Sequence, residues 1–135
     1  MYFFSRAACP TRPCPSAKRF DYSSRAFGDV YALSAGLAYL EKVGVGRIEA
    51  HTVDTLARRL QEGLVRQGHR MFTPPGNRSS IVTFYTTKPE ADVRSAFQTA
   101  KVEVTVRTEM VRVSAALFNN ADDVDRCLDV TKRLV

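Results

Sequence analysis

The chain has 135 residues, the length of one domain, and its 44% hydrophobic and 25% charged content is typical of a globular protein. Its apolar runs are far shorter than the ~18 residues that a membrane span needs, so we expect no membrane partner. The formal charge is +6, but residues 1–25 hold five basic residues and one acid, and no basic run is interleaved with aromatics. We therefore expect no nucleic-acid partner.

Residues 1–17 form an irregular, basic lead-in. They contain three prolines and no apolar periodicity after Phe4. A mitochondrial transit peptide, a disordered tail and a misplaced start codon would all have this composition. We expect a cytoplasmic location and leave these three origins of the lead-in open.

A first helix is predicted over residues 25–43, with Ser23 or Ser24 available as its N-cap. Small residues are frequent in this segment, which indicates close packing against another element. Gly44 follows where the end of a helix favours a positive φ. The apolar stripe consists of Val30, Leu33, Leu37 and Leu40.

A second helix is predicted over residues 46–67, because apolar residues recur there every four positions and Gly68 closes the pattern. A short strand follows at 69–73, and the composition of residues 74–77 predicts a turn. Residues 81–85 predict a strand with apolar side chains on both faces, which indicates a central position in a sheet.

A third helix is predicted over residues 89–99, with Pro89 at a first helical position and Val93 and Phe97 buried. The last helix is predicted over residues 121–134, capped by Asn119 or Asn120. Its buried stripe should be Val124, Cys127, Leu128 and Thr131.

Residues 102–115 alternate between valine and polar side chains, which predicts a β-hairpin. With Thr108 and Glu109 as a two-residue turn, the valines share one face of the hairpin. The paired residues would be Val106 with Val111 and Val104 with Val113. The elements together predict an α+β two-layer domain with two leading helices, a small, mainly antiparallel sheet and a C-terminal helix.

The opposite face of this hairpin carries two arginines, Arg107 and Arg112. Two cations on one sheet face repel each other unless water or an anion separates them. One interpretation is a solvated strand face with Glu103 as the counter-ion. The other is a site at which a planar guanidinium donates two parallel hydrogen bonds to a carboxylate.

The cysteines and histidines do not predict a metal or nucleophile site. Three cysteines are an odd number and match no disulfide framework, and Cys9 and Cys14 have no second pair or histidine cluster near them. Cys127 falls among the apolar positions of the last helix and is expected to be a small core residue. His51 and His69 have no partner at ligand spacing, so we expect structural or exposed positions.

Several segments in order resemble motifs of one family. They are residues 19–24 (RFDYSS), 33–44 (LSAGLAYLEKVG), 48–51 (IEAH), 78–84 (RSSIVTF) and 111–125 (VRVSAALFNNADDVD). Over residues 18–135 the chain resembles the C-terminal small domain of the class V aminotransferases, which include cysteine desulfurases and selenocysteine lyases. These are pyridoxal-phosphate enzymes of fold type I that act on amino acids, and the resemblance implies a homodimer or a separate large domain as partner.

The resemblance also implies roles for individual residues. Arg112 would bind the α-carboxylate of an amino-acid substrate, and Arg107 would help to shape the anionic pocket. Ser24 stands where the family has a threonine that contacts the cofactor phosphate from the neighbouring subunit, and a plain N-cap is the alternative for it. Ser23 replaces the glycine that precedes this threonine in the family.

Two departures from the family limit the expected activity. None of the lysines stands in the His-Lys context of the Schiff base; they are Lys18, Lys42, Lys88, Lys101 and Lys132. We therefore assign no catalytic residue and expect no cofactor binding and no activity from this chain alone. The turn at Thr108-Glu109 lacks the reactive cysteine of desulfurases, which disfavours that reaction. The alternatives are a free-standing module that binds an anionic small ligand and a domain that binds a protein partner.

Overall fold

The computed structural model describes residues 16–17 and 26–135, so Ser23, Ser24 and most of the lead-in lie outside the described residues. The chain divides after Leu40 into two units, and each is described by itself. The elements are α1 (Phe27–Val43), α2 (Val45–Glu49), η2 (Ala50–Ala57), α3 (Arg58–Arg66), β1 (Ile81–Tyr85), α4 (Glu90–Thr99), β2 (Thr105–Arg107), β3 (Met110–Ser114) and α5 (Ala121–Thr131).

Helix α1 confirms the first predicted helix, and it ends at Gly44, whose φ is +94°. None of its 17 residues is buried. A helix that is apolar on nearly all sides is ordinarily enclosed by other structure. Its large exposed apolar residues are Phe27, Val30, Tyr31, Leu33, Leu37, Tyr39 and Leu40. Within the described residues, no helix combines the length and the apolar character that a membrane crossing requires.

The second predicted helix is confirmed as the consecutive segments α2, η2 and α3, which end at Gly68 with φ at +87°. The sequence did not predict that the middle segment, η2, is π-helical. There the amide of Arg58 reaches back five residues to the carbonyl of Val53, and the Thr55 hydroxyl donates to the carbonyl of Ala50 at 3.0 Å. A π-helical segment changes which side chains face the core, and Thr52, Leu56 and Ala57 are the buried ones here.

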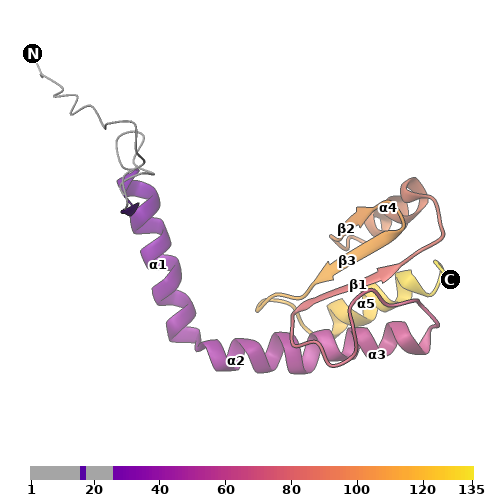
Figure 1. Ribbon diagram of the computed structural model, residues 1–135, viewed down its shortest axis with the longest axis horizontal. Helices are drawn as coiled ribbons and strands as arrows, with labels where there is room; N and C mark the ends of the chain where they lie inside the picture. The colour runs from indigo at the N-terminus through magenta and orange to yellow at the C-terminus, as the bar shows by residue number, and fades with distance from the viewer. Residues whose placement is uncertain (1–15, 18–25) are drawn as a thin grey trace, which may run out of the picture. The chain divides into compact units, whose positions relative to one another are not determined.

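The sheet is antiparallel and has the strand order β1-β3-β2 (Figure 1). The predicted hairpin register is confirmed where Val106 faces Val111. The second predicted pair, Val104 with Val113, is wrong, because β2 begins at Thr105 and Val104 therefore lies outside the strand pairing. Val113 instead pairs with Val82 of β1.

The prediction that residues 81–85 form the central strand is also wrong, since β3 occupies that place. The edge of β1 that faces away from β3 nevertheless pairs with residues 69–73, the segment predicted as a short strand. The amide of Phe72 donates to the carbonyl of Thr83 at 2.9 Å, and the amide of Tyr85 donates to the backbone carbonyl of Arg70 at 2.8 Å. This segment forms only a bridge at Met71, because the chain bends at Phe72 and Thr73, whose amides both donate to the carbonyl of Thr83.

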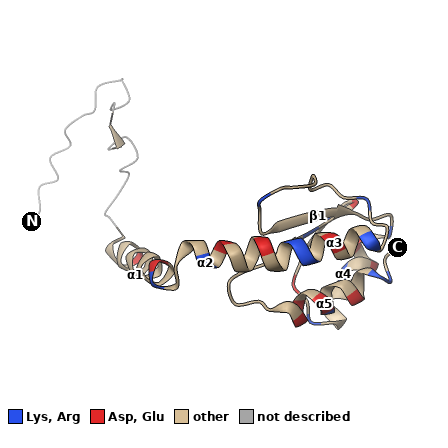
Figure 2. Cartoon of the chain, turned by 90° about the horizontal axis from the view of Figure 1, so that it is seen from below, with Lys and Arg blue, Asp and Glu red and all other residues tan. Residues whose placement is uncertain are grey.

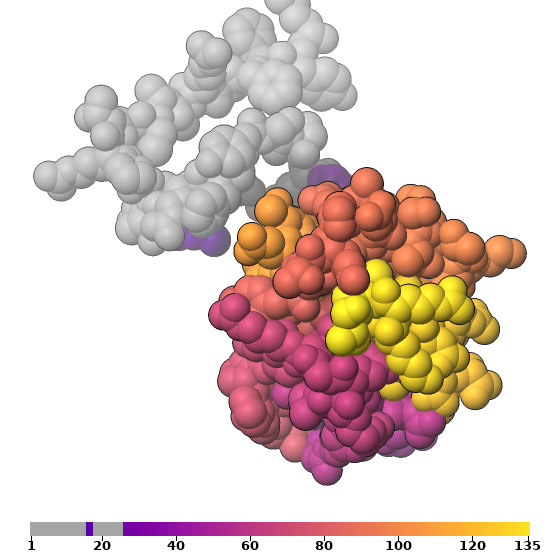
Figure 3. Space-filling model, turned by 90° about the vertical axis from the view of Figure 1, so that its right-hand side faces the viewer, coloured from indigo at the N-terminus to yellow at the C-terminus, as the bar shows by residue number. Residues whose placement is uncertain are grey.

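The helices of residues 41–135 pack against one face of the sheet, and together they form a single hydrophobic core (Figure 1). In Figure 3 the yellow C-terminal residues lie between the magenta helix α3 and the coral residues of the α4 region. The predicted burial of Val93, Phe97 and the α5 stripe is confirmed, and Val130 is buried as well. The core is made of Leu56, Ala57, Leu60, Leu64, Val82, Phe84, Val93, Phe97, Val106, Val111, Val124, Cys127, Leu128, Val130 and Leu134.

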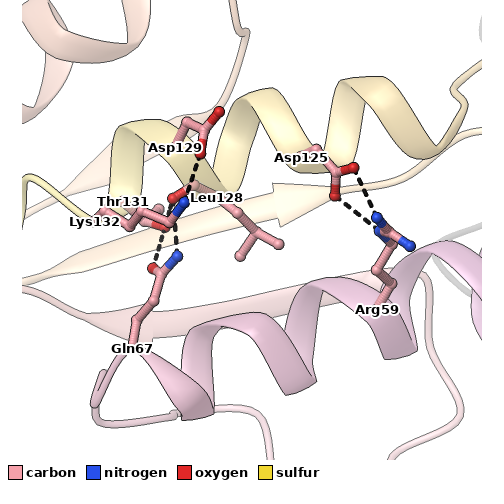
Figure 4. A network of polar contacts seen from close by, with 7 residues as sticks. All are labelled: Arg59, Gln67, Asp125, Leu128, Asp129, Thr131 and Lys132. Atoms are coloured by element: carbon pink, nitrogen blue, oxygen red, sulfur yellow. Dashed lines mark hydrogen bonds and ion pairs between the residues drawn. The ribbon is translucent and has the colours of Figure 1, made fainter.

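Polar contacts join α3 to α5 at two points (Figure 4). Arg59 donates two hydrogen bonds to the carboxylate of Asp125, at 2.8 and 2.7 Å, and these bonds lower the pKa of Asp125. At the other end, the side-chain amide nitrogen of Gln67 donates to the carbonyl of Leu128 at 2.9 Å. Its amide oxygen accepts a hydrogen bond from the hydroxyl of Thr131 at 2.7 Å. Charged residues are frequent on α3 and α5 in Figure 2, whereas the ribbon of α1 is mostly uncharged.

Gly63 allows this close approach of α3 to α5. A Cβ added there would lie 2.5 Å from one methyl carbon of Leu128 and 2.6 Å from the other, and Leu128 is itself buried. We expect Gly63→Ala to lower the free energy of unfolding by about 1–3 kcal/mol, as overpacked cores do. The matched control is Gly46→Ala in α2, where a Cβ meets nothing within 4 Å and alanine favours a helix. Urea unfolding measures the free energy of unfolding of both variants. Equal values for Gly63→Ala and Gly46→Ala would contradict the prediction.

His69 is buried against the ring of Phe84, with ring centroids 4.7 Å apart, and its Nε2–H donates to the carbonyl of Thr131 at 3.1 Å. Burial lowers the pKa of His69 below its ordinary value of 6.5, and the hydrogen bond opposes this shift only in part. The unfolded chain therefore binds the proton more readily. Stability from this group is complete above pH 6.5 and declines as the pH falls toward the folded pKa.

We therefore expect the free energy of unfolding to fall as the pH is lowered from about 7 to 5. NMR titration of the His69 imidazole signals measures the cause directly. A midpoint for His69 at or above 6.5 would contradict the assignment.

Candidate anion-binding face of the sheet

The second face of the sheet carries the predicted site residues. Along β1 and β3 the side chains alternate, so that Val82, Phe84 and Val111 enter the core. The residues between them therefore point to the opposite face. There the cross-strand rows are Thr83–Arg112–Thr105 and Tyr85–Met110–Arg107.

Arg112 occupies the middle of the first row on the central strand. Its side chain is exposed, and the hydroxyl residues Thr83 and Thr105 stand directly opposite it on the two flanking strands. Residues in such pairs have Cβ atoms about 4.5–5.5 Å apart, close enough for one small ligand to contact all three. Within residues 16–17 and 26–135, Arg112 forms no hydrogen bond or ion pair.

Arg107 lies on the edge strand β2 and is exposed as well. Glu103, the alternative counter-ion, forms no ion pair with either arginine in the described part of the chain. Arg107 borders a shallow hollow between β2 and the start of α4, together with Thr105, Thr108 and Arg94. Arg94 is already engaged, since it donates to Glu90 and to the carbonyl of Val106, each at 2.6 Å.

The sequence did not predict the aromatic group at the other side of this face. The guanidinium of Arg70 lies 4.3 Å from the centroid of the Tyr85 ring, and the Phe72 ring meets Tyr85 edge-on at 5.9 Å. The guanidinium–ring contact is a cation–π interaction, which holds Arg70 against β1. Only the predicted strand at 69–73 could have indicated that these side chains lie beside Tyr85.

Several residues of the family-like motifs contact one another. Arg78 donates to Glu49 at 2.8 Å and to Asp54 at 3.1 Å, and these carboxylates raise the pKa of Arg78. His51 donates to the carbonyl of Asn119 at 2.8 Å. The motifs around Glu49, Arg78 and Asn119 therefore help to hold the domain together.

The remaining candidate groups have structural surroundings. Cys127 is buried in the core as predicted, and burial raises the pKa of its thiol to about 12, so it is not a nucleophile near neutral pH. His51 and His69 both bond to backbone carbonyls, so of the two positions expected for them, structural or exposed, both take the structural one. Across the described residues, no cluster of three or more His, Cys, Asp or Glu side chains could hold a metal ion.

The described residues do not fit a pyridoxal-phosphate site. Schiff-base chemistry needs a lysine with a lowered pKa, which burial ordinarily provides. Lys42, Lys88, Lys101 and Lys132 are all exposed, and Lys132 pairs with Asp129 at 2.8 Å. Ser24, the predicted phosphate contact, and Lys18 lie outside the described residues.

Comparison with known proteins identifies the architecture. No family model matches the sequence, and no curated protein matches it. The apo structure of the cysteine desulfurase from Thermococcus onnurineus NA1 matches with a TM-score of 0.78 and 24% sequence identity. The chain has the fold of part of a cysteine desulfurase.

The match to the Thermococcus desulfurase covers 88% of this chain but only 34% of that enzyme. The chain therefore spans about a third of the length of the desulfurase that it matches. The covered share exceeds what residues 41–135 alone provide, so the match continues into the segment that contains α1. The predicted α+β class is confirmed, with its leading helices, small antiparallel sheet and C-terminal helix.

Proposed function

We propose that residues 18–135 act as the C-terminal small domain of a pyridoxal-phosphate-dependent enzyme of the class V aminotransferase type. In the complete enzyme, Arg112 binds the α-carboxylate of an amino-acid substrate. The cofactor is held by a large domain that this sequence does not contain. The complete assembly works as a homodimer, in which Ser24 reaches the cofactor phosphate of the neighbouring subunit.

One observation carries this proposal: Arg112 is exposed and unpaired within the described residues, at the centre of a sheet face in a fold shared with a cysteine desulfurase. A guanidinium binds a carboxylate through two parallel hydrogen bonds. Thr83 and Thr105 beside it add hydroxyl groups that accept or donate. The face therefore offers what an α-carboxylate requires.

Pyridoxal phosphate supplies an electron sink for carbanions formed on amino acids. The described lysines do not fit its attachment, so the work of this chain is to bind and orient the substrate. The β2–β3 turn consists of Thr108 and Glu109, and the thiol of Cys127 is buried. A reaction that carries sulfur on a cysteine of this hairpin is therefore disfavoured, even though the structural neighbour is a desulfurase.

A free-standing module that binds an anionic metabolite is the second candidate function. It is favoured by the same unpaired arginines, Arg107 and Arg112, because they would bind an anion without any further domain. The two functions differ in their need for a large domain. Only the first predicts turnover of amino acids when such a domain is supplied.

The chain alone is expected to form no specific adduct with pyridoxal phosphate. The described lysines are exposed and stand in no Schiff-base context, so they should react slowly and without selectivity. The test is incubation with the cofactor, borohydride reduction and peptide mass mapping, first on the chain alone and then on the chain joined to a large domain. Labelling spread over several lysines, and amino-acid turnover only in the joined protein, support the proposal. One stoichiometrically labelled lysine in the chain alone would overturn it.

A further inference from the structure

We infer that the substrate is an amino acid with a second carboxylate on its side chain, and that Arg107 binds this second carboxylate. The inference rests on the proposed function, in which Arg112 binds the α-carboxylate. It adds the class of substrate, which the fold itself does not specify. It follows from the position of the two arginines and from the hollow beside Arg107.

The strand register sets the spacing of the two arginines. Arg107 pairs with Met110, and Arg112 lies two residues further along β3. The arginines are therefore diagonal neighbours on one face, about 7–8 Å apart at the backbone. Side chains as long as arginine reach across that distance in either direction. Two guanidiniums can thus meet two carboxylates that are separated by a short carbon chain.

The surroundings of Arg107 leave room for a separate anion. The hollow next to it is lined by polar groups, including the hydroxyl residues Thr105 and Thr108. Thr105 stands opposite Arg112 and also precedes Arg107 by two positions on the same face, so it is a neighbour of both arginines. Glu90 in the same hollow is neutralised by its hydrogen bonds from Arg94, at 2.9 and 2.6 Å. No other described carboxylate borders this hollow.

Arg70 is a weaker candidate for the second anion. It lies beside β1, on the far side of Thr83 and Tyr85 from β2, and its guanidinium is stacked on the Tyr85 ring at 4.3 Å. Releasing it would cost that contact. Arg107 has no contact to give up within the described residues.

The test compares glutarate with butyrate, which has one carboxylate fewer, by saturation-transfer NMR titration of the full chain at constant ionic strength. We expect glutarate to bind about fivefold more tightly than butyrate, as one further exposed ion pair allows. Arg107→Ala should remove this preference and leave the butyrate affinity unchanged. Arg112→Ala should weaken both ligands. Arg133→Ala, which removes an exposed arginine beyond α5, and Arg70→Ala should change neither.

Each other result overturns the inference in a recognisable way. Equal affinities for the two acids, both sensitive to Arg112→Ala, would leave the proposed function intact and refute the second carboxylate. Equal weakening of both acids by Arg107→Ala would show that the two arginines share one carboxylate. Loss of the glutarate preference in Arg70→Ala would move the second site to β1. Affinities that Arg112→Ala does not change would refute the proposed function itself.

Discussion

The isolated chain should self-associate at micromolar concentration through α1. This helix presents apolar side chains on nearly all sides, and none of its residues is buried. Exposed apolar area of this extent drives association, at about 25 cal/mol for each Å² that contact removes from water. Sedimentation velocity over a concentration series should show oligomers, with a distribution that shifts with concentration.

Replacing Leu33 and Leu37 together with glutamine should shift the chain strongly toward monomer. Glutamine keeps a high helix propensity, so α1 should persist in the variant while its apolar surface shrinks. The matched control is Val65→Gln, which removes a single exposed apolar side chain from α3. A wild-type chain that remains monomeric at every concentration would contradict the prediction and favour the free-standing module.

Local patterns in the sequence predicted most elements, because each depends on nearby residues. The glycines at 44 and 68 end their helices with positive φ, and Asn120 caps α5 as one of the two residues proposed. The hairpin turn followed from the alternation of valines, which one core face imposes. These features need no knowledge of distant contacts, so the sequence predicted them well.

Features that depend on distant partners were missed or wrong. The strand order is decided by long-range pairing, so the apolar character of residues 81–85 did not reveal that β3 is central. Tyr85 is apolar on the second face because it lies under the Arg70 guanidinium and meets the edge of Phe72, and both residues are more than ten positions earlier in the sequence. The π-helical form of η2 has no propensity signal in its residues. The contacts of Arg78 and Arg59 with carboxylates likewise join segments far apart in the chain.

The candidate site was predicted only in part, because it combines a local pattern with a long-range strand pairing. Alternation along the hairpin placed Arg107 and Arg112 on one face, and the structure brings them together there. Thr83 joins them only through the pairing of β1 with β3, which the hairpin pattern could not supply. The carboxylate role of Arg112 came from the family resemblance alone, and it stays a prediction that needs a functional test.

That test requires this chain in a complete active site, joined to a large domain or co-expressed with one. A charge-assisted, bidentate bond to a carboxylate contributes roughly 1.5–3 kcal/mol. Arg112→Ala should therefore lower kcat/KM for the amino acid by about ten- to a hundredfold, mainly through KM. Arg112→Lys should recover only part of this loss, because lysine keeps the charge but cannot donate two parallel bonds from a planar group.

Cofactor absorbance should stay at the wild-type level in both Arg112 variants, since in the proposed function the large domain supplies the lysine that holds the cofactor. Arg133→Ala provides the matched control, because it removes the same charge from an exposed position after α5. Unchanged kcat/KM in both Arg112 variants would make Arg112 a solvated strand residue. A loss produced by Arg107→Ala alone would show that Arg107, on the edge strand, binds the α-carboxylate instead.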